Sequence, residues 1–195
     1  GSWVLLIDCV LRSPSVARAL NRENEVGLAE YLKGETTYQH IIQRSDNQYL
    51  FLIFAGRPVS DASELFAKPE CRQFLEACRG TFDYIILDTP PCGLLADSVS
   101  LARAADCAIY VLGAGAVQAP QALDGIQYLA ESGTALLGCV LNGVQTRGQR
   151  YGYGYGYHYG YGYGYGHGRG KYAAVSGSAA DSIPETLPED PDAPD

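Results

Sequence analysis

The sequence lacks several features that would place it in a common class of protein. It has no run of 18 apolar residues, so no segment is expected to cross a membrane as a helix, and work at a membrane would require another chain to hold it there. Its cysteines form no C-x-x-C pair or other metal-ligand spacing, which argues against a zinc site. Its 14 Lys and Arg residues form no basic face, which excludes nucleic acid as a partner.

The cysteines that are present lie mostly inside apolar runs, where cysteine behaves as a small hydrophobic residue. We expect reduced core residues of a cytosolic protein at Cys9, Cys71, Cys78, Cys92, Cys107 and Cys139. The formal net charge of −8 is unevenly distributed, because residues 173–195 hold six acids and no Lys or Arg. The chain is therefore predicted to be a near-neutral globular body with an acidic C-terminal segment.

Short apolar runs alternate with helical patterns along residues 1–144. The apolar runs are continuous, which is typical of strands buried on both faces of a parallel sheet, and they cover 3–7, 49–54, 84–87, 108–112 and 136–141. Helices are expected over 14–21, 27–33, 36–44, 61–79, 97–105 and 118–132. This alternation predicts an α/β fold with a mainly parallel sheet flanked by helices.

Two of the apolar runs end in a carboxylate. LLIDCVLRSPS, residues 5–15, delivers Asp8 to the C-terminal end of a strand, where α/β sheets bind their ligands, and Arg12 follows. Asp8 could hold Mg²⁺ or take up a proton, or it could cap the next helix. FDYIILDTPP, residues 82–91, ends its apolar run in Asp88, which is the arrangement of a Walker B acid beside nucleotide phosphates. A simple strand-ending turn is the less specific alternative.

Residues 151–166 read YGYGYGYHYGYGYGYG. Glycine on both sides leaves each tyrosine exposed and the backbone free to enter the active site of another protein. The other interpretation is an aromatic low-complexity segment that adheres to surfaces. Composition does not separate these two hypotheses, and both treat the segment as disordered.

Taken together, LLIDCVLR, FDYIILDTPPCGLLAD and LLGCVLN followed by a tyrosine cluster resemble the bacterial tyrosine kinases of capsule and exopolysaccharide synthesis. Segments 26–34 and 55–66 are also similar to that family, and the resemblance covers about residues 3–145. It implies a P-loop NTPase fold of the MinD/ParA type. It also implies that ATP and Mg²⁺ are used to phosphorylate the C-terminal tyrosines in trans.

The resemblance also implies roles for individual residues. Asp8 would contact Mg²⁺ and accept the proton of the incoming tyrosine, Arg12 matches the arginine of the same motif, and Asp88 matches the Walker B acid that holds Mg²⁺. Asn142 falls where relatives contact adenine. The matching phosphoacceptors are Tyr151, Tyr153, Tyr155, Tyr157, Tyr159, Tyr161, Tyr163, Tyr165 and Tyr172.

Partners and location are likewise implied by the resemblance alone. They are a membrane-anchored activator or chain-length-determinant protein, a protein tyrosine phosphatase, and further copies of the chain in a ring-like homo-oligomer. The implied location is cytoplasmic, with recruitment to the inner face of the cell membrane by the partner.

The chain departs from the family pattern at two places. Val10 replaces the second acid of the motif that contains Asp8, and an apolar side chain binds neither metal nor proton. No G-x-x-x-x-G-K-[ST] phosphate loop, or Walker A motif, is present, since none of Lys33, Lys68 and Lys171 lies in one. GSWVLLID is similar to the segment that follows that loop in the family. A strand, loop and helix of about 30 residues are therefore expected to be missing in front, in a truncated chain or a natural pseudokinase.

We thus expect a partial P-loop kinase-like domain over 1–145, a phosphoacceptor tail over 146–172 and an acidic disordered tail over 173–195. The favoured function is a protein-tyrosine autokinase that regulates capsular or exopolysaccharide synthesis and is impaired as written. One alternative is a non-catalytic phosphoacceptor or scaffold of the same system. Another is a MinD/ParA-type ATPase, which the Tyr-Gly segment disfavours.

The first prediction concerns the tyrosines of residues 151–165. Incubation with an intact kinase of this family, ATP and Mg²⁺ is expected to phosphorylate them, because glycine neighbours leave them accessible. Each phosphate adds about −1.5 to −2 charges, so full modification would repel the tail from an acidic site. Mass spectrometry of the tail peptide is the measurement, and phosphate found only elsewhere in the chain would refute the assignment.

Overall fold

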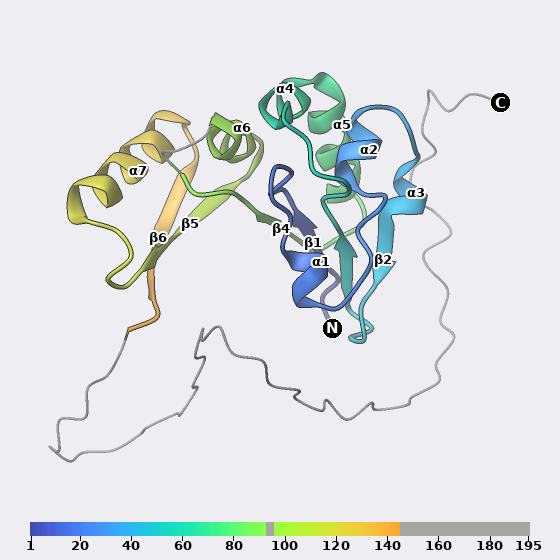
Figure 1. Cartoon of the computed structure of the whole chain (residues 1–195), viewed down its shortest axis with the longest axis horizontal. Coiled ribbons are helices and arrows are strands. Elements are labelled where there is room, and N and C mark those ends of the chain that lie inside the picture. Colours follow the sequence, from blue (N-terminus) through green and yellow to red (C-terminus); the bar gives the residue numbers. More distant parts are fainter. Residues whose placement is uncertain (93–95, 145–195) are drawn as a thin grey trace, which may run out of the picture.

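The computed structural model describes residues 1–92 and 96–144 (Figure 1). The elements in chain order are β1 (Val4–Asp8), α1 (Val16–Ala19), α2 (Leu28–Leu32), α3 (Tyr38–Ile41), β2 (Ile42–Arg44), β3 (Leu50–Ile53), α4 (Ala62–Ala67), α5 (Pro69–Arg79), β4 (Tyr84–Asp88), α6 (Ala96–Ala104), β5 (Cys107–Gly113), α7 (Ala119–Glu131) and β6 (Ala135–Asn142). The expected phosphoacceptor and acidic tails, 146–172 and 173–195, lie outside the described residues, so the assignments made there stay predictions.

The strands form two sheets with mainly parallel pairing. A four-stranded sheet has the order β2-β3-β1-β4, in which β1 pairs in parallel with both β3 and β4, and β2 pairs antiparallel at the edge. A two-stranded parallel sheet is made by β5 and β6. The predicted α/β class with a mainly parallel sheet and flanking helices is confirmed.

The core lies on the two faces of the four-stranded sheet. Leu5 and Ile7 of β1 are fully buried in the main cluster, which includes side chains from α2, α4 and α5. The opposite face is covered by α1, where Ala17 packs with Leu52 and Phe54. Burial of β1 on both faces explains why its sequence is a continuous apolar run instead of an alternating one.

Two of the expected helices differ from the sequence prediction. The helix expected over 61–79 is divided into α4 and α5 at Lys68, whose ψ of 145° is extended because the following Pro69 disfavours helical geometry. The helix expected over 36–44 is helical only over Tyr38–Ile41, and Ile42–Arg44 instead pair with β3. Pairing with an available sheet edge overrides weak helical propensity in this short segment.

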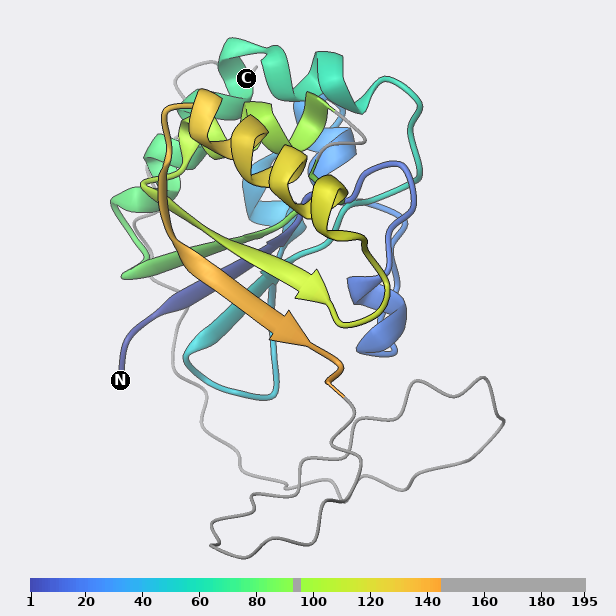
Figure 2. The same cartoon turned by 90° about the vertical axis from the view of Figure 1, so that its left-hand side faces the viewer.

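An open edge separates the two sheets. No pairing joins β4 to β5 among the described strands, and in Figure 2, which looks from the side of β5 and β6, these two strands lie in front of the four-stranded sheet with α7 alongside them. Ile86 of β4 is 52% exposed, and Ile109 and Val111 of β5 are each 60% exposed. The expectation that these strands are buried on both faces is therefore wrong for the described residues.

A groove follows this open edge. It has a volume of about 230 Å³ and is lined by Ile85 and Leu87 of β4, by Leu75 of α5, and by residues 104–107, which run from the end of α6 to the first residue of β5. The groove and the exposed apolar side chains together show that apolar surface between β4 and β5 is left without a covering element in the described part of the chain.

The cysteines also divide between the two halves of the structure. None of the six, all of which lie in the described ranges, forms a disulfide, and Cys9, Cys71 and Cys78 are buried in the main core, as expected. Cys107 and Cys139 are exposed because they lie on β5 and β6. The prediction that these two are core residues is wrong, and the cause is again the absence of a covering element on these strands.

The second prediction compares two isoleucines on neighbouring strands. Ile7→Ala is expected to lower the free energy of unfolding by about 2–5 kcal/mol, because Ile7 is fully buried. Ile86→Ala is expected to lower it by about 0.5 kcal/mol or less, because Ile86 is 52% exposed. Urea denaturation of both variants is the measurement. Equal losses would show that the exposed face of β4 is covered in solution.

Candidate active site

The site begins with the register between β1 and β4. These strands pair in parallel from Val4 opposite Tyr84 to Asp8 opposite Asp88, so both carboxylates come to the same edge of the sheet. The backbone N–H of Cys9 donates to the carbonyl of Asp88 at 2.8 Å, which joins the strands just beyond their last pair. Two acids from segments 80 residues apart are thereby placed on one face, as expected for strands that end at a common ligand-binding edge.

Asp8 is fully buried, and backbone groups occupy both of its carboxylate oxygens. Oδ1 accepts the N–H of Val10 at 3.0 Å, and Oδ2 accepts the N–H of Val16 at 3.2 Å. Val16 is the first residue of α1, so Asp8 satisfies one of the free donors at the start of that helix. The structure thus shows the capping role for Asp8, which the sequence left as one of two possibilities.

Asp88 is the more accessible acid of the two. It is half-buried, and its pKa is raised, first by burial and then by the negative charge of Asp8. The thiol of Cys9 packs in the main core, and its pKa is raised well above the ordinary value by burial, with smaller contributions from Cys71, Asp8 and Asp88. Cys9 is therefore a neutral packing residue in this site and not a nucleophile.

Arg12 is held by polar groups on two other elements. Its Nε donates to Oδ2 of Asp97 at 3.2 Å, and a second guanidinium nitrogen donates to Oγ of Ser63 at 3.1 Å. The third donates to the carbonyl of Ser60. Asp97 is buried, with only 2% of its side chain exposed. Arg12 is therefore directed toward α4 and α6 and not toward the two acids.

Asn142 and Val10 complete the set of residues that the sequence singled out. Asn142 is the last residue of β6 and is exposed. Its backbone carbonyl accepts the N–H of Ala114 at 2.8 Å. It belongs to the two-stranded sheet, and no contact recorded for the described residues brings it to the acids. The backbone N–H of Val10 donates to the carboxylate of Asp8, and the apolar side chain of Val10 offers no metal ligand.

The carboxylates of Asp8 and Asp88 supply part of the ligand set that a divalent cation requires. Mg²⁺ takes oxygen ligands, prefers one or two carboxylates and keeps several waters, and Asp8 and Asp88 are two carboxylates at adjacent register positions. No cluster of three or more His, Cys, Asp or Glu side chains able to hold a metal occurs within residues 1–92 and 96–144. A cation here would therefore depend on phosphate oxygens and water for its remaining ligands.

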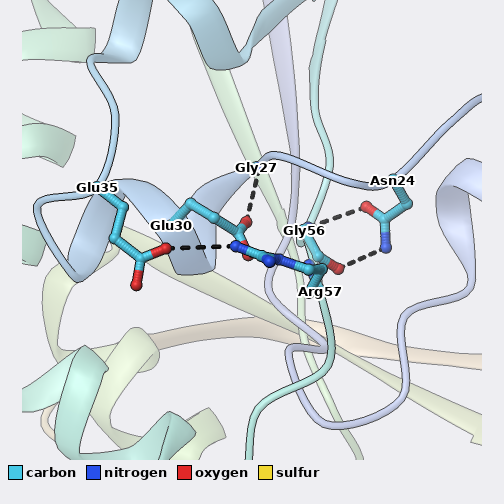
Figure 3. A network of polar contacts seen from close by, with 6 residues as sticks. All are labelled: Asn24, Gly27, Glu30, Glu35, Gly56 and Arg57. Atoms are coloured by element: carbon cyan, nitrogen blue, oxygen red, sulfur yellow. Dashed lines mark hydrogen bonds and ion pairs between the residues drawn. The ribbon is translucent and has the colours of Figure 1, made fainter.

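A second buried carboxylate organises the loop after β3 (Figure 3). Glu30 accepts the N–H of Gly27 at 2.9 Å and Nε of Arg57 at 3.2 Å, and Glu35 contacts the other end of the same guanidinium. Asn24 bonds both the N–H and the carbonyl of Gly56. Gly56 has a φ of 83°, so this turn requires glycine. The network fixes a loop at the same end of the sheet as Asp8.

The sequence analysis did not single out Asp97, Ser98 or Glu30. Asp97 and Ser98 are among the few buried polar residues, at 1% and 4% exposure, and Ser98 donates to the carbonyl of Pro90 at 2.6 Å. A carboxylate at the start of an expected helix is ordinarily interpreted as a solvent-exposed cap. Only the contacts of Asp97 in the folded chain distinguish it from such an exposed cap.

Comparison with known proteins identifies similar chains. No family model matches. Tyrosine-protein kinase YwqD of Bacillus subtilis (strain 168) is 34% identical over 144 residues, which are 73% of this chain and 60% of that protein. Tyrosine-protein kinase CpsD of Streptococcus pneumoniae serotype 4 (strain ATCC BAA-334 / TIGR4) is 30% identical over 153 residues, or 78% and 67%. The chain thus spans about 60 to 67% of the length of these relatives.

Two solved structures have folds similar to that of this chain. The kinase domain of the Escherichia coli tyrosine kinase ETK is 30% identical with a TM-score of 0.71, over 80% of this chain and 62% of that one. The septum site-determining protein MinD of Pyrococcus horikoshii OT3, solved with Mg-ADP, has a TM-score of 0.59 over 72% and 58%, and at 21% identity it supports the fold alone. The predicted fold of the MinD/ParA P-loop type is confirmed.

The third prediction concerns the charge on Asp88. Its raised pKa means that the folded chain binds the proton more tightly than the unfolded chain, so ionised Asp88 destabilises the fold as pH rises through the folded pKa. Asp88→Asn is therefore expected to increase the free energy of unfolding at pH 7. The gain should disappear below the unfolded pKa of about 3.9.

Urea denaturation between pH 3.5 and 7 is the measurement. Asp106→Asn is the matched control, because Asp106 is exposed and pairs with Arg79, so removal of its charge should bring no gain. A loss of stability at pH 7 in Asp88→Asn would contradict the account by showing that the carboxylate has a stabilising cationic partner.

Proposed function

This chain belongs to the bacterial tyrosine-protein kinase family, and we propose that it forms the metal-binding half and the phosphoacceptor tail of a protein-tyrosine autokinase that regulates capsular or exopolysaccharide synthesis. The observation that carries this proposal is the in-register pairing of Asp8 with Asp88 at the edge of a parallel sheet. Phosphoryl transfer depends mainly on positioning and charge neutralisation, and two carboxylates at one edge can hold the cation that supplies the neutralising charge.

ATP with Mg²⁺ would supply the phosphoryl group and the positive charge that neutralises it. Asp88, half exposed, is the residue proposed to hold the cation through its carboxylate or through water. Asp8 is the residue proposed to accept the proton as the tyrosine oxygen bonds to the γ-phosphorus and the bond to the leaving ADP oxygen breaks. Since both oxygens of Asp8 accept backbone N–H groups, this role requires the 9–16 loop to release one of them.

The open edge between β4 and β5 is the position that we propose for the phosphate-binding element. The 195 residues contain no G-x-x-x-x-G-K-[ST] motif, so the backbone N–H groups and lysine that grip phosphates in this fold are absent from them. A strand added beside β4 would cover Ile86 and would end near Asp88, at the edge where ligands bind. We propose that such a strand, carrying the phosphate loop, completes the site.

The tail and partners complete the proposal. The substrates are the tyrosines of residues 151–165 together with Tyr172, presented to another copy of the chain. The proposed partners are a membrane-anchored activator or chain-length-determinant protein and a protein tyrosine phosphatase, with the kinase acting at the inner face of the cell membrane. No helix in the described ranges is long and apolar enough to cross a membrane.

The lack of a phosphate-loop motif in the 195 residues also favours a second candidate function. A chain without a phosphate loop could serve as a phosphoacceptor and scaffold for an intact kinase. Nucleotide binding separates the two functions, because a scaffold needs the tail but not Asp88.

The fourth prediction concerns ATP binding by the 195-residue chain. Titration calorimetry is expected to show no micromolar binding of ATP–Mg²⁺, because Asp8 and Asp88 are both negative and face a polyanion without a loop to hold it. Fusion of a strand with a phosphate loop in front of Gly1 is expected to confer binding and tail phosphorylation, and Asp88→Ala in that fusion to abolish phosphorylation.

Two results would overturn the proposal. Micromolar binding by the chain alone that is lost in Asp88→Ala would show that a site forms without the loop. A fusion that binds ATP–Mg²⁺ yet phosphorylates no tyrosine would refute the kinase assignment and leave a nucleotide-binding regulator. The control variant is Glu30→Gln, which alters a buried carboxylate outside the acid pair.

A further inference from the structure

The first turn of α6 contacts both loops that follow the acid-bearing strands. Asp97 accepts Nε of Arg12, which lies four residues after Asp8, at 3.2 Å. Ser98, the next residue along, donates to the carbonyl of Pro90, two residues after Asp88, at 2.6 Å. Adjacent side chains on one helical turn therefore hold the loop after β1 and the loop after β4.

The contact through Asp97 extends to a third element. Ser63 of α4 donates to the other carboxylate oxygen of Asp97 and accepts from Arg12 at 3.1 Å, and the carbonyl of Ser60 accepts the remaining guanidinium nitrogen. These four polar groups hydrogen-bond to one another. Because Asp97 is buried and all its oxygens are used, this is a fixed assembly and not a solvated surface pair.

The acids require such restraint. Asp8 and Asp88 lie side by side, so the two carboxylates repel each other when both are ionised. Just beyond the last paired residues of β1 and β4, the backbone N–H of Cys9 donates a hydrogen bond to the carbonyl of Asp88. This bond links the two segments directly. Contacts from α6 to both loops oppose their separation, and the pair of Arg12 with Asp97 adds no net charge.

We propose that the first turn of α6 positions the two carboxylates of the site, with Arg12 and Asp97 acting as one unit on the loop of Asp8 and Ser98 acting on the loop of Asp88. Arg12 is then a positioning residue that acts through Asp97 and does not contact substrate. This inference rests on the proposed kinase function for its purpose, but the restraint itself is measurable without any phosphotransfer.

Amide hydrogen exchange on the full 195-residue chain, followed by NMR, is the test. Asp97→Asn keeps the shape of the side chain and removes its charge, and Arg12→Gln removes the partner from the partly exposed side. Each is expected to speed exchange at the N–H groups of Cys9 and Val10 by about tenfold or more while leaving Leu5 to Ile7 within about twofold. The double variant should exchange no faster than either single variant, because the two residues act as a unit.

Glu30→Gln is the matched control, because Glu30 is also a buried carboxylate paired with an arginine. It should speed exchange at Gly27 and leave Cys9 unchanged. Unchanged exchange at Cys9 in Asp97→Asn and Arg12→Gln would overturn the proposal. So would equal acceleration along the whole of β1, which would show that the pair contributes only to overall stability. Ser98→Ala provides an independent check from the other loop, with the same increase expected at Cys9.

The outcomes for restraint and for function are separable. In the fusion that carries a phosphate loop, Arg12→Gln is expected to lower kcat for tail phosphorylation about tenfold while KM for ATP stays within about twofold, because the nucleotide grip lies elsewhere. If the parent fusion phosphorylates nothing but the exchange pattern is as described, the kinase function fails and the positioning role stands. A change confined to KM would assign Arg12 to nucleotide binding and overturn the positioning role.

Discussion

The parallel register between β1 and β4 is the constraint on which the rest of the site depends. It fixes Asp8 opposite Asp88, and a shift by one residue would direct one acid to the other face of the sheet. The register is itself held by burial, since Leu5 and Ile7 of β1 are enclosed by the main core on the face away from α1. Hydrophobic packing in the centre of the sheet thus sets the spacing of two charges at its edge.

Placing two carboxylates together is unfavourable unless other groups compensate. Backbone N–H groups of Val10 and Val16 stabilise Asp8, whereas no such donor to Asp88 is found among residues 1–92 and 96–144, and the pKa of Asp88 is raised. A cation with phosphate would neutralise the pair, and the open side of β4 leaves space for the element that would bring phosphate there. The exposed apolar side chains of β4 and β5 and the two neighbouring carboxylates therefore lie beside the same unpaired edge of the four-stranded sheet.

Much of this arrangement was predictable from the sequence, because apolar runs ending in Asp8 and Asp88 predict parallel strands whose acids meet at one edge. The division at Lys68 followed from Pro69, although the expected helix ran through it. The exposure of Ile109 and Val111 was not predictable, because an apolar run reports what a strand needs to bury and not whether a partner is present. Nor was the pairing of Arg12 with Asp97, which joins residues 85 positions apart.

The most direct test of the account is the distance between β4 and β5 in a crystal structure of the chain fused to a strand with a phosphate loop and bound to ATP and Mg²⁺. Neighbouring strands lie about 4.7–4.9 Å apart, so one intervening strand places β4 and β5 about 9.4–9.8 Å from each other. The account predicts that separation, with the added strand parallel to both and the cation beside Asp88. Direct pairing of β4 with β5 at about 4.8 Å, with the added strand elsewhere, would contradict it.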